Sequence, residues 1–531
     1  MIKIMTQHSF APRLKSLALV FGIALAFASC ANEDIAQNQN GKDSDASLTT
    51  FSTGDPTTRT SMESNGTFYW EAGDKIYVKD DNGTWNVSSN SPTGKTAYFR
   101  FKVPGTYTAH MSYEVYYPGK NGNQNQVTIA ANQSQAEPNS TAHFGVSGDC
   151  GMADAAWSNT KNGFAFTLDH KAAYLLFLPR TSNTILHDCY LTNVEVNSDN
   201  DITSTYTLDP TTGELTGTGT GKQIIVSTGG SGTYANGFPL TNNATSAATN
   251  GAYVVIKPGT HILKIRYWVK DVATGTEGTI TKTLASATYD QNKYYNITAN
   301  LDVKNYDGDH YYMWDAQNQY WNGYEWTKHL SGDTGQPTLD GNSSSNYPQN
   351  SSDANNRWYN TSYPGYGVSN PATHTSFNNV PNANEMSWYC MYGDPRWDGD
   401  ELWTTMGHLY KGGMWFKKKS VLQAENHYDT EKSANGTTDM RTTNGYYSNS
   451  NSSINNSGLP SAADANKYFY LPALGYYTSG ELSSIGGRSG YWSSSASPLS
   501  RYNAYYLDFT SGGVYVNSYS RRYGFRAEAL Q

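Results

Sequence analysis

The chain has 531 residues, and after a leader about 500 of them would remain, which is more than one hydrophobic core usually serves. Only 15% of its residues are charged, and its net charge of -8 comes without a basic stripe, which argues against a nucleic-acid partner. Tyr (42 residues) and Gly (49) are abundant, together with Asn, Ser and Thr. This composition is typical of an ordered, strand-rich protein rather than a disordered one.

The first thirty residues have the pattern of an export signal. Lys3, Arg13 and Lys15 precede an apolar run over residues 17–27. This run is about half the roughly 20 residues that a helix needs to cross a bilayer. The pattern therefore predicts a signal peptide over residues 1–30 rather than a transmembrane helix.

Residues 27–30, Phe-Ala-Ser-Cys, resemble the lipobox of bacterial lipoproteins. The resemblance implies acylation of Cys30 with palmitate-type chains, which would hold the protein to outer-membrane lipid. Glu33 and Asp34 follow at once and resemble the signal that directs some lipoproteins to the outer face of the cell. Secretion without an anchor is the alternative.

Residues 31–50 are polar and predict a flexible tether. From residue 51 to 303, short apolar runs alternate with Gly, Pro, Asn and Asp clusters, as in residues 174–178 and 253–256. Such spacing is typical of β-sandwiches. We place the boundary between two sandwiches near residue 160, giving domains 51–160 and 161–303. His170 has no acid or Cys partner close in sequence and is interpreted as structural.

Four segments in order, Thr58-Arg59-Thr60, 68–78, 164–178 and 293–303, resemble the fimbrillin family of lipoprotein pilus subunits. The resemblance implies two tandem transthyretin-like β-sandwiches and assembly with other fimbrial subunits. It also implies cleavage between Arg59 and Thr60 by an Arg-specific protease, after which the opened groove accepts a strand from the next subunit. A plain strand role for Arg59 is the alternative.

Tyr and Trp become frequent in residues 304–531. Segments 384–422 and 468–526 resemble the C-terminal domain found behind fimbrillin modules, which is related to C-type-lectin-like and sulfatase-modifying-factor folds. The resemblance implies an α+β C-type-lectin-like domain, with helix and loop over residues 394–422. Gly512-Gly513 between two alternating runs independently predicts a β-hairpin.

The sequence gives little support for a catalytic site or a metal site. Cys150, Cys189 and Cys390 lack the spacing of a zinc site, so no metal and no cofactor are expected. Cys150 and Cys189 could pair, although buried free thiols are the favoured interpretation. The sulfatase-modifying oxidases use a cysteine pair, and this domain has Cys390 alone. We therefore expect no enzyme; the acids Asp398, Asp400 and Glu401 could imitate a glycosidase dyad but are interpreted as a solvated loop.

Aromatic and arginine side chains of the C-terminal domain are the candidate ligand surface, because Trp and Tyr rings stack on sugars or anchor interfaces. The candidates are Trp388, Arg396, Trp397, Trp403, Trp415, Tyr491, Trp492, Tyr519, Arg521 and Arg522. The alternative is that most of these rings build a core that is poor in Leu and Ile.

The sequence thus predicts a surface lipoprotein that acts as a tip or minor fimbrial subunit and adhesin. Its C-terminus runs into a folded domain, so it cannot be donated as a strand. The expected ligand is a host or bacterial surface protein or glycan. A stand-alone glycan-binding lipoprotein for nutrient capture is the alternative.

Overall fold

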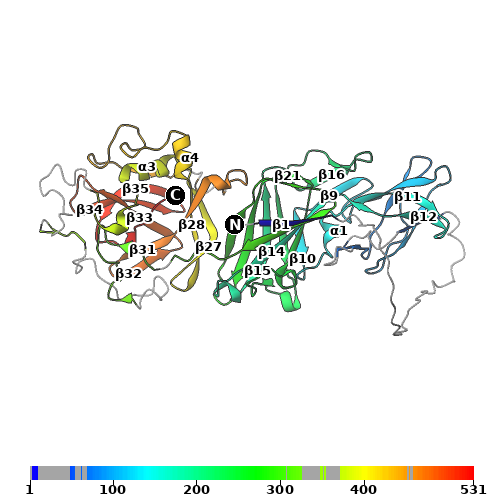
Figure 1. Cartoon of the computed structure of the whole chain (residues 1–531), viewed down its shortest axis with the longest axis horizontal. Coiled ribbons are helices and arrows are strands. Elements are labelled where there is room, and N and C mark those ends of the chain that lie inside the picture. Colours follow the sequence, from blue (N-terminus) through cyan, green and yellow to red (C-terminus); the bar gives the residue numbers. More distant parts are fainter. Residues whose placement is uncertain are drawn as a thin grey trace, which may run out of the picture.

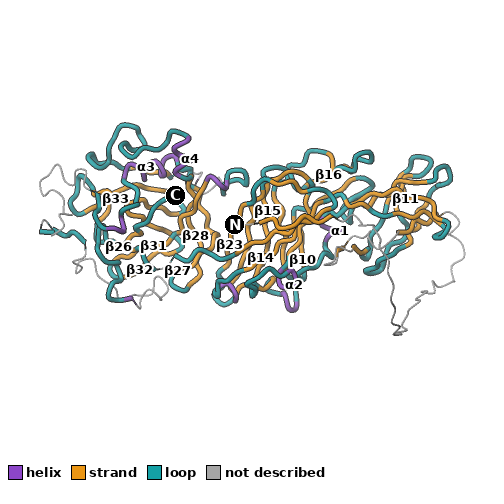
Figure 2. The backbone as a smooth tube through the Cα atoms, viewed as in Figure 1, coloured by secondary structure: helices purple, strands orange, loops and turns teal. Residues whose placement is uncertain are grey.

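Strands dominate the structure, and helices are few and short, which confirms the mainly β expectation. The computed structural model describes residues 3–9, 48–53, 61–62, 68–306, 308–325, 347–350, 352–353, 371–450, 454 and 459–531. Figure 1 shows an elongated molecule, with the start of the folded body at one end and the last strands at the other. Figure 2 shows strands throughout and only short helices between them. No helix in these ranges is long and apolar enough to cross a membrane.

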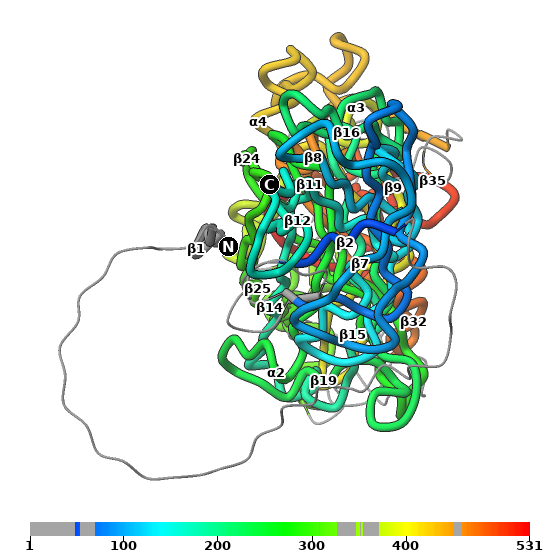
Figure 3. Tube along the Cα trace, turned by 90° about the vertical axis from the view of Figure 1, so that its right-hand side faces the viewer, coloured from blue at the N-terminus to red at the C-terminus, as the bar shows by residue number. Residues whose placement is uncertain are grey.

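The N-terminal unit, as we call it, is one sheet around an aromatic core that contains Phe51, Trp70, Phe101 and Phe164. The sheet order is β6-β5-β8-β11-β12-β2-β7, with β13 paired to β11. These strands are β2 (Leu48–Thr53), β5 (Tyr77–Lys79), β6 (Trp85–Val87), β7 (Arg100–Pro104), β8 (Ser112–Tyr117), β11 (Gly151–Ser158), β12 (Gly163–Phe166) and β13 (Asp169–His170). Two short strands, β3 (Ser61–Met62) and β4 (Phe68–Tyr69), pair separately. Figure 3 views the molecule from this end, with β2 beside β7.

The boundary expected near residue 160 falls inside the hairpin of β11 and β12, where Trp157 pairs with Phe164. The N-terminal core extends to Leu168. Conversely, Val127 and Phe144 belong to the next core along the molecule. The chain therefore crosses between the two units more than once, because strand partners far apart in sequence complete each core.

The central unit encloses the largest core between two sheets. One sheet has the order β1-β25-β14-β20, and the other begins β10-β18-β15-β22-β23. Their strands are β1 (Lys3–Ser9), β10 (Asn132–Gln135), β14 (Ala173–Arg180), β15 (Cys189–Ser198), β18 (Gln223–Thr228), β20 (Ala252–Ile256), β22 (Leu263–Asp271), β23 (Glu277–Thr283) and β25 (Lys293–Asn300). Smaller elements are β9 (Gln126–Ile129), α1 (Phe144–Ser147), β16 (Ser204–Leu208), β17 (Leu215–Thr216), β19 (Phe238–Pro239), α2 (Ala247–Asn250), β21 (Gly259–His261) and β24 (Ala287–Tyr289).

Two glutamines of β10 close the β20 edge of the first of these sheets. The Gln133 side chain accepts a hydrogen bond from Val255 N (3.0 Å) and donates one to Val255 O (2.8 Å). Gln135 does the same with Tyr253 N (2.7 Å) and Gly251 O (2.8 Å). The two amides thus replace a neighbouring strand, since they satisfy backbone groups that would otherwise be unpaired.

Gln135→Ala is expected to destabilise the central unit by about 1–3 kcal/mol, because it leaves the buried Tyr253 N–H and Gly251 C=O without these partners. Hydrogen exchange at Tyr253 in the full chain measures the effect. Gln126→Ala is the matched control, because that amide bonds to Thr207 at the exposed surface, 2.9 Å away. Equal exchange at Tyr253 in both variants would contradict the edge-closing role of Gln135.

The C-terminal unit has two neighbouring cores, one of them around Trp314, Trp492 and Phe525. Its main sheet has the order β26-β36-β33-β34-β35-β29, and a second group extends the central sheet. The elements are β26 (Tyr311–Tyr312), α3 (Ala383–Tyr392), β27 (Arg396–Thr405), β28 (His408–Lys417), α4 (Lys419–Ala424), β29 (Tyr447–Asn449), β30 (Tyr468–Pro472), β31 (Leu474–Thr478), β32 (Glu481–Ile485), β33 (Arg488–Ala496), β34 (Asn503–Thr510), β35 (Gly513–Ser520) and β36 (Phe525–Arg526). The predicted hairpin at Gly512-Gly513 joins β34 to β35.

Helix α3 begins with a capping box, in which the Asn382 side chain accepts from Glu385 N and Glu385 accepts from Asn382 N. Helix and loop were expected over residues 394–422, but this prediction is wrong for most of the segment, which forms the β27–β28 hairpin. Its tight turn uses Met406 and Gly407 at positive φ, a signal that the sequence gives only weakly.

The cysteines Cys150, Cys189 and Cys390 are buried free thiols, as the sequence interpretation favoured. Burial raises the pKa of the Cys390 thiol to about 12, so it is protonated and inert at neutral pH. His170 is also buried, and its Nδ1 lies 2.8 Å from Asp149 Oδ1, an acid distant in sequence. That pair lies where the N-terminal and central units meet, which fits a structural role.

Candidate functional site

Strand β2 lies inside the N-terminal sheet, although it comes first in the folded chain. It pairs in parallel with β12 and antiparallel with β7, so that Phe51 stands opposite both Phe164 and Phe101. Phe51 is fully buried, and its ring centroid lies 5.1 Å from those of Tyr107 and Phe164. If β2 left, β7 and β12 would each present an unpaired edge and a hydrophobic gap between them, which is a receptive site for another strand.

Arg59 and Thr60, the expected cleavage site, and Cys30, the expected lipidation site, lie outside the described residues. The last residue of β2 is Thr53, which comes before Arg59 in the chain. A cut after Arg59 would therefore separate β2 from everything that follows.

The central unit offers a second strand edge. On β25, the residues from Lys293 to Thr298 pair with β1, a segment inside the expected signal peptide. The other neighbour of β25 is β14. In a chain that begins at Cys30, β25 would thus be the one exposed edge of this described sheet, because Gln133 and Gln135 cover β20.

Four of the ten predicted ligand residues are almost completely buried: Trp403, Tyr491, Trp492 and Arg521 are each at most 1% exposed. Trp492 packs on Phe525 at 4.7 Å, and the Arg521 guanidinium lies 4.6 Å above the Trp314 ring. They form core rather than ligand surface, because this unit fills its interior with rings where other folds use Leu and Ile.

Four other candidates are only partly accessible or lie apart. Trp388 is 7% exposed and donates to Lys432 O (2.8 Å). Arg396 forms an ion pair with Asp394, and Trp415 donates from Nε1 to Asp398 Oδ2 at 3.1 Å. Trp397 is half-buried on the same hairpin. The structure therefore does not gather the ten candidates on one face.

Tyr519 and Arg522 remain accessible, and they belong to a larger group that we call the tyrosine–arginine surface: Tyr476, Arg488, Tyr519, Arg522 and Tyr523. Tyr519 is 41% exposed, and its ring centroid lies 4.7 Å from that of Tyr523. The ring centroid of Tyr476 lies 6.2 Å from that of Tyr523, and the Arg488 guanidinium carbon lies 5.1 Å from the Tyr476 ring centroid. Strands β31, β33 and β35 and the turn that follows β35 bring these side chains together.

Hydrogen bonds hold side chains of this surface in position. Arg488 donates to both oxygens of Asp508, at 2.8 and 2.9 Å. The hydrogen bond between Tyr519 and Tyr523 raises the pKa of Tyr519 and lowers the pKa of Tyr523. Rigid Tyr rings with hydroxyls beside Arg groups suit a polar ligand that also has an apolar face.

Sequence reasoning missed Tyr476, Arg488 and Tyr523. The period of two in β35 marks Tyr519 as outward-facing. The cross-strand partners of Tyr519 depend on the register of β31 and β33, which no local pattern encodes.

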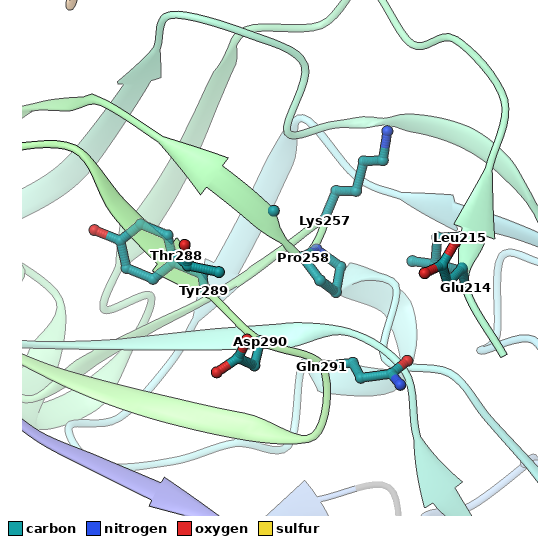
Figure 4. A pocket seen from close by; sticks show the side chains of 9 residues that line it. Glu214, Leu215, Lys257, Pro258, Thr288, Tyr289, Asp290 and Gln291 are labelled. Atoms are coloured by element: carbon teal, nitrogen blue, oxygen red, sulfur yellow. The ribbon is translucent and has the colours of Figure 1, made fainter. Parts of the chain in front are cut away.

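A separate hollow of about 430 Å³ lies in the central unit, between β17 and the β21–β24 pair. Figure 4 shows its lining, which includes Glu214, Lys257, Thr288 and Asp290. Lys257 Nζ forms an ion pair with Asp201 Oδ2 at 2.9 Å, and Asp290 accepts a hydrogen bond from the Tyr295 hydroxyl at 3.2 Å. Most of its polar groups are thus used within the protein. Across the described ranges, no three His, Cys, Asp or Glu side chains are grouped so as to hold a metal ion.

Asp398 and Glu401 are not an open dyad. Asp398 is 2% exposed and accepts from Arg266 (3.1 Å) and Trp415. Glu401 accepts from Thr279 and Thr281 of the central unit. Both acids lie at the junction of the central and C-terminal units rather than on a solvated loop.

No family model and no curated protein matches the chain. Among solved structures, it is similar to a candidate cell adhesion protein from Bacteroides ovatus, with 14% identity, a TM-score of 0.29, and coverage of 48% of this chain and 93% of that chain. A second, from Bacteroides uniformis, has 16% identity, a TM-score of 0.25, and coverage of 48% and 93%. A fimbrial protein from Bacteroides ovatus has 11% identity and a TM-score of 0.24, and it matches 90% of this chain and 99% of that chain.

Proposed function

We propose that the protein is a cell-surface lipoprotein that serves as a tip or minor fimbrial subunit and adhesin. The lipobox-like residues before Cys30 and the acids after it support export to the outer face of the outer membrane. The order of the four fimbrillin-like segments, from residues 58–60 to 293–303, supports the family resemblance. The N-terminal and central units are the stalk side, and the lectin-like C-terminal unit faces the ligand.

The observation that carries this proposal is the position of β2. It fills the place between β7 and β12, and it lies upstream of Arg59. Cleavage followed by loss of β2 leaves a gap shaped for one strand of a partner subunit. Strand exchange then joins subunits by main-chain hydrogen bonds.

Strand β36, near the end of the C-terminal unit, is built into the fold of that unit. Strand β36 pairs with both β26 and β33, and Arg526 within it is 1% exposed. Tyr389 donates to the last residue, Gln531, at its O atom (3.1 Å). A strand that is part of its own core cannot serve the next subunit, so β36 is not a donor strand.

An Arg-specific protease tests the assembly step. The full chain is incubated with the protease, and the new N-terminus is sequenced; we expect Thr60, with release of the segment that carries β2. The cut protein, mixed with a pilin, should then give boiling-resistant ladders on gels. Arg59→Lys keeps the charge and should stay intact and monomeric. An uncut Arg59–Thr60 bond in the wild-type protein would refute this step.

Stand-alone glycan capture is the second candidate, and the tyrosine–arginine surface favours it. The full chain is probed on an array of glycans and host proteins. Tyr519→Ser combined with Tyr523→Ser should weaken binding at least tenfold, because central Tyr anchors contribute about 2 kcal/mol or more. Tyr446→Ser, at a residue 55% exposed elsewhere in this unit, is the control. Binding to glycans without ladder formation would favour capture over assembly.

A further inference from the structure

The central and C-terminal units share one continuous sheet. Strand β23 runs parallel to β27, with Thr279 opposite Glu401, and β28 and β30 continue the order. A Cβ atom added to Gly278 would lie 2.3 Å from Asp400 O, so the two strands approach closely. Leu402 of β27 packs into the core of the central unit. The junction is therefore a packed interface and not a loose linker.

Buried charges cross this interface. Arg266 Nη2 lies 3.1 Å from Asp398 Oδ1, with the side chains 9% and 2% exposed. The same guanidinium group donates to Thr279 Oγ1 at 3.0 Å. Lys264 is also buried and donates to Pro460 O at 2.6 Å. Two cations of the central unit thus reach toward the C-terminal unit.

Glu401 of the C-terminal unit reaches across the interface to the central unit. It accepts hydrogen bonds from Thr281 N (2.9 Å), Thr281 Oγ1 (2.6 Å) and Thr279 Oγ1 (3.1 Å). A hydroxyl group can accept as well as donate, so a protonated Glu401 would keep these partners. The ionised form, in contrast, adds a second partly desolvated carboxylate beside Asp398.

We propose that this junction is a pH-responsive latch, which closes when Glu401 takes up a proton and loosens when Glu401 loses that proton. Burial, followed by the charge of Asp398, raises the pKa of Glu401 to about 7. The device belongs to the junction alone and does not depend on whether the protein joins a fimbrium.

The direction in which pH shifts the closing of the junction follows from proton linkage. With the junction closed, Glu401 has a pKa of about 7, whereas its ordinary value of 4.5 applies once it is exposed. Between these values the closed form binds the extra proton, so lowering the pH favours closure. The ratio of closed to open molecules then rises by up to about tenfold for each pH unit below 7.

The charged and titratable groups that face Glu401 are Asp398 on β27, Arg266 and Lys264 on β22, Lys282 on β23, Tyr470 on β30, and Tyr306. Burial lowers the pKa of Lys264 to about 8, so Lys264 changes its charge at a higher pH than Glu401 does. The pKa values of Tyr470 and Tyr306 are raised by burial, and both stay neutral. Glu401 is therefore the group that sets the slope below pH 7.

Hydrogen exchange at the Thr281 amide tests the latch, because this N–H donates across the junction to Glu401. Protection factors, corrected for the intrinsic rate, are measured in the full chain from pH 5 to pH 8. We expect protection at Thr281 to rise by up to about tenfold for each pH unit as the pH falls below 7. Protection at Val254, in the core of the central unit, should change far less.

Glu401→Gln is the matched variant, because it keeps an acceptor for Thr281 and removes the titration. Its Thr281 protection should be high and independent of pH. Glu481→Gln removes the same charge from an exposed position on β32 and should behave as the wild type. A flat Thr281 profile in the wild-type chain overturns the proposal without any variant, as does a wild-type slope that persists in Glu401→Gln.

Discussion

Replacing Phe51 with alanine is expected to destabilise the N-terminal unit by about 3–5 kcal/mol. The ring is fully buried, and it packs on both Tyr107 and Phe164 at 5.1 Å. Its loss leaves a cavity in the middle of the sheet, which the neighbouring rings cannot fill. Hydrogen exchange of β7 and β12 amides in the full chain gives the change in free energy of opening.

Thr49→Ala is the control for this variant, because Thr49 lies on the same strand and is only partly buried. It should cost much less than Phe51→Ala. If strand exchange proceeds through the gap left by β2, Phe51→Ala should also release the cleaved β2 segment faster. Equal stability of the two variants would mean that β2 contributes little to this core.

The local patterns of the sequence predicted many strands correctly. The alternation and apolar runs over residues 253–256 and 174–178 became β20 and β14, and Gly512-Gly513 became a hairpin turn. Pairing between distant segments could not be predicted in this way: β10 pairs in parallel with β18, some ninety residues away in the chain. Such pairing leaves no mark on the local sequence.

The candidate site was harder to predict than the fold. A strand that is buried on both faces shows no alternation, so β33 gives no local sign that Trp492 is buried. The period of two in β35, in contrast, marks Tyr519, which is 41% exposed. Arg521 had a charge that suggested solvent, yet it lies over Trp314 in the interior. The role of Asp398 required its distant partner Arg266 to be known.

Asp398→Ala is expected to destabilise the junction by about 3–5 kcal/mol, because it leaves the buried Arg266 charge without its carboxylate. It also removes the acceptor of Trp415 Nε1. Exchange of β27 amides and thermal unfolding of the full chain measure the loss. Glu431→Ala is the control, because Glu431 pairs with Arg441 at 2.5 Å but is 67% exposed; such a pair contributes about 1 kcal/mol or less.

The double variant Arg266→Met with Asp398→Leu separates two explanations of that loss. A buried ion pair gains little net stability, since desolvation offsets the attraction between the charges, and a single substitution costs much because it strands the remaining charge. The double variant should therefore recover most of the stability that Asp398→Ala loses. If it stays as unstable as the single variant, the junction depends on the geometry of the pair rather than on charge balance. The double variant removes the Asp398 charge, which raises the pKa of Glu401, together with the smaller opposing effect of the Arg266 charge, so it should also close at a lower pH than the wild type.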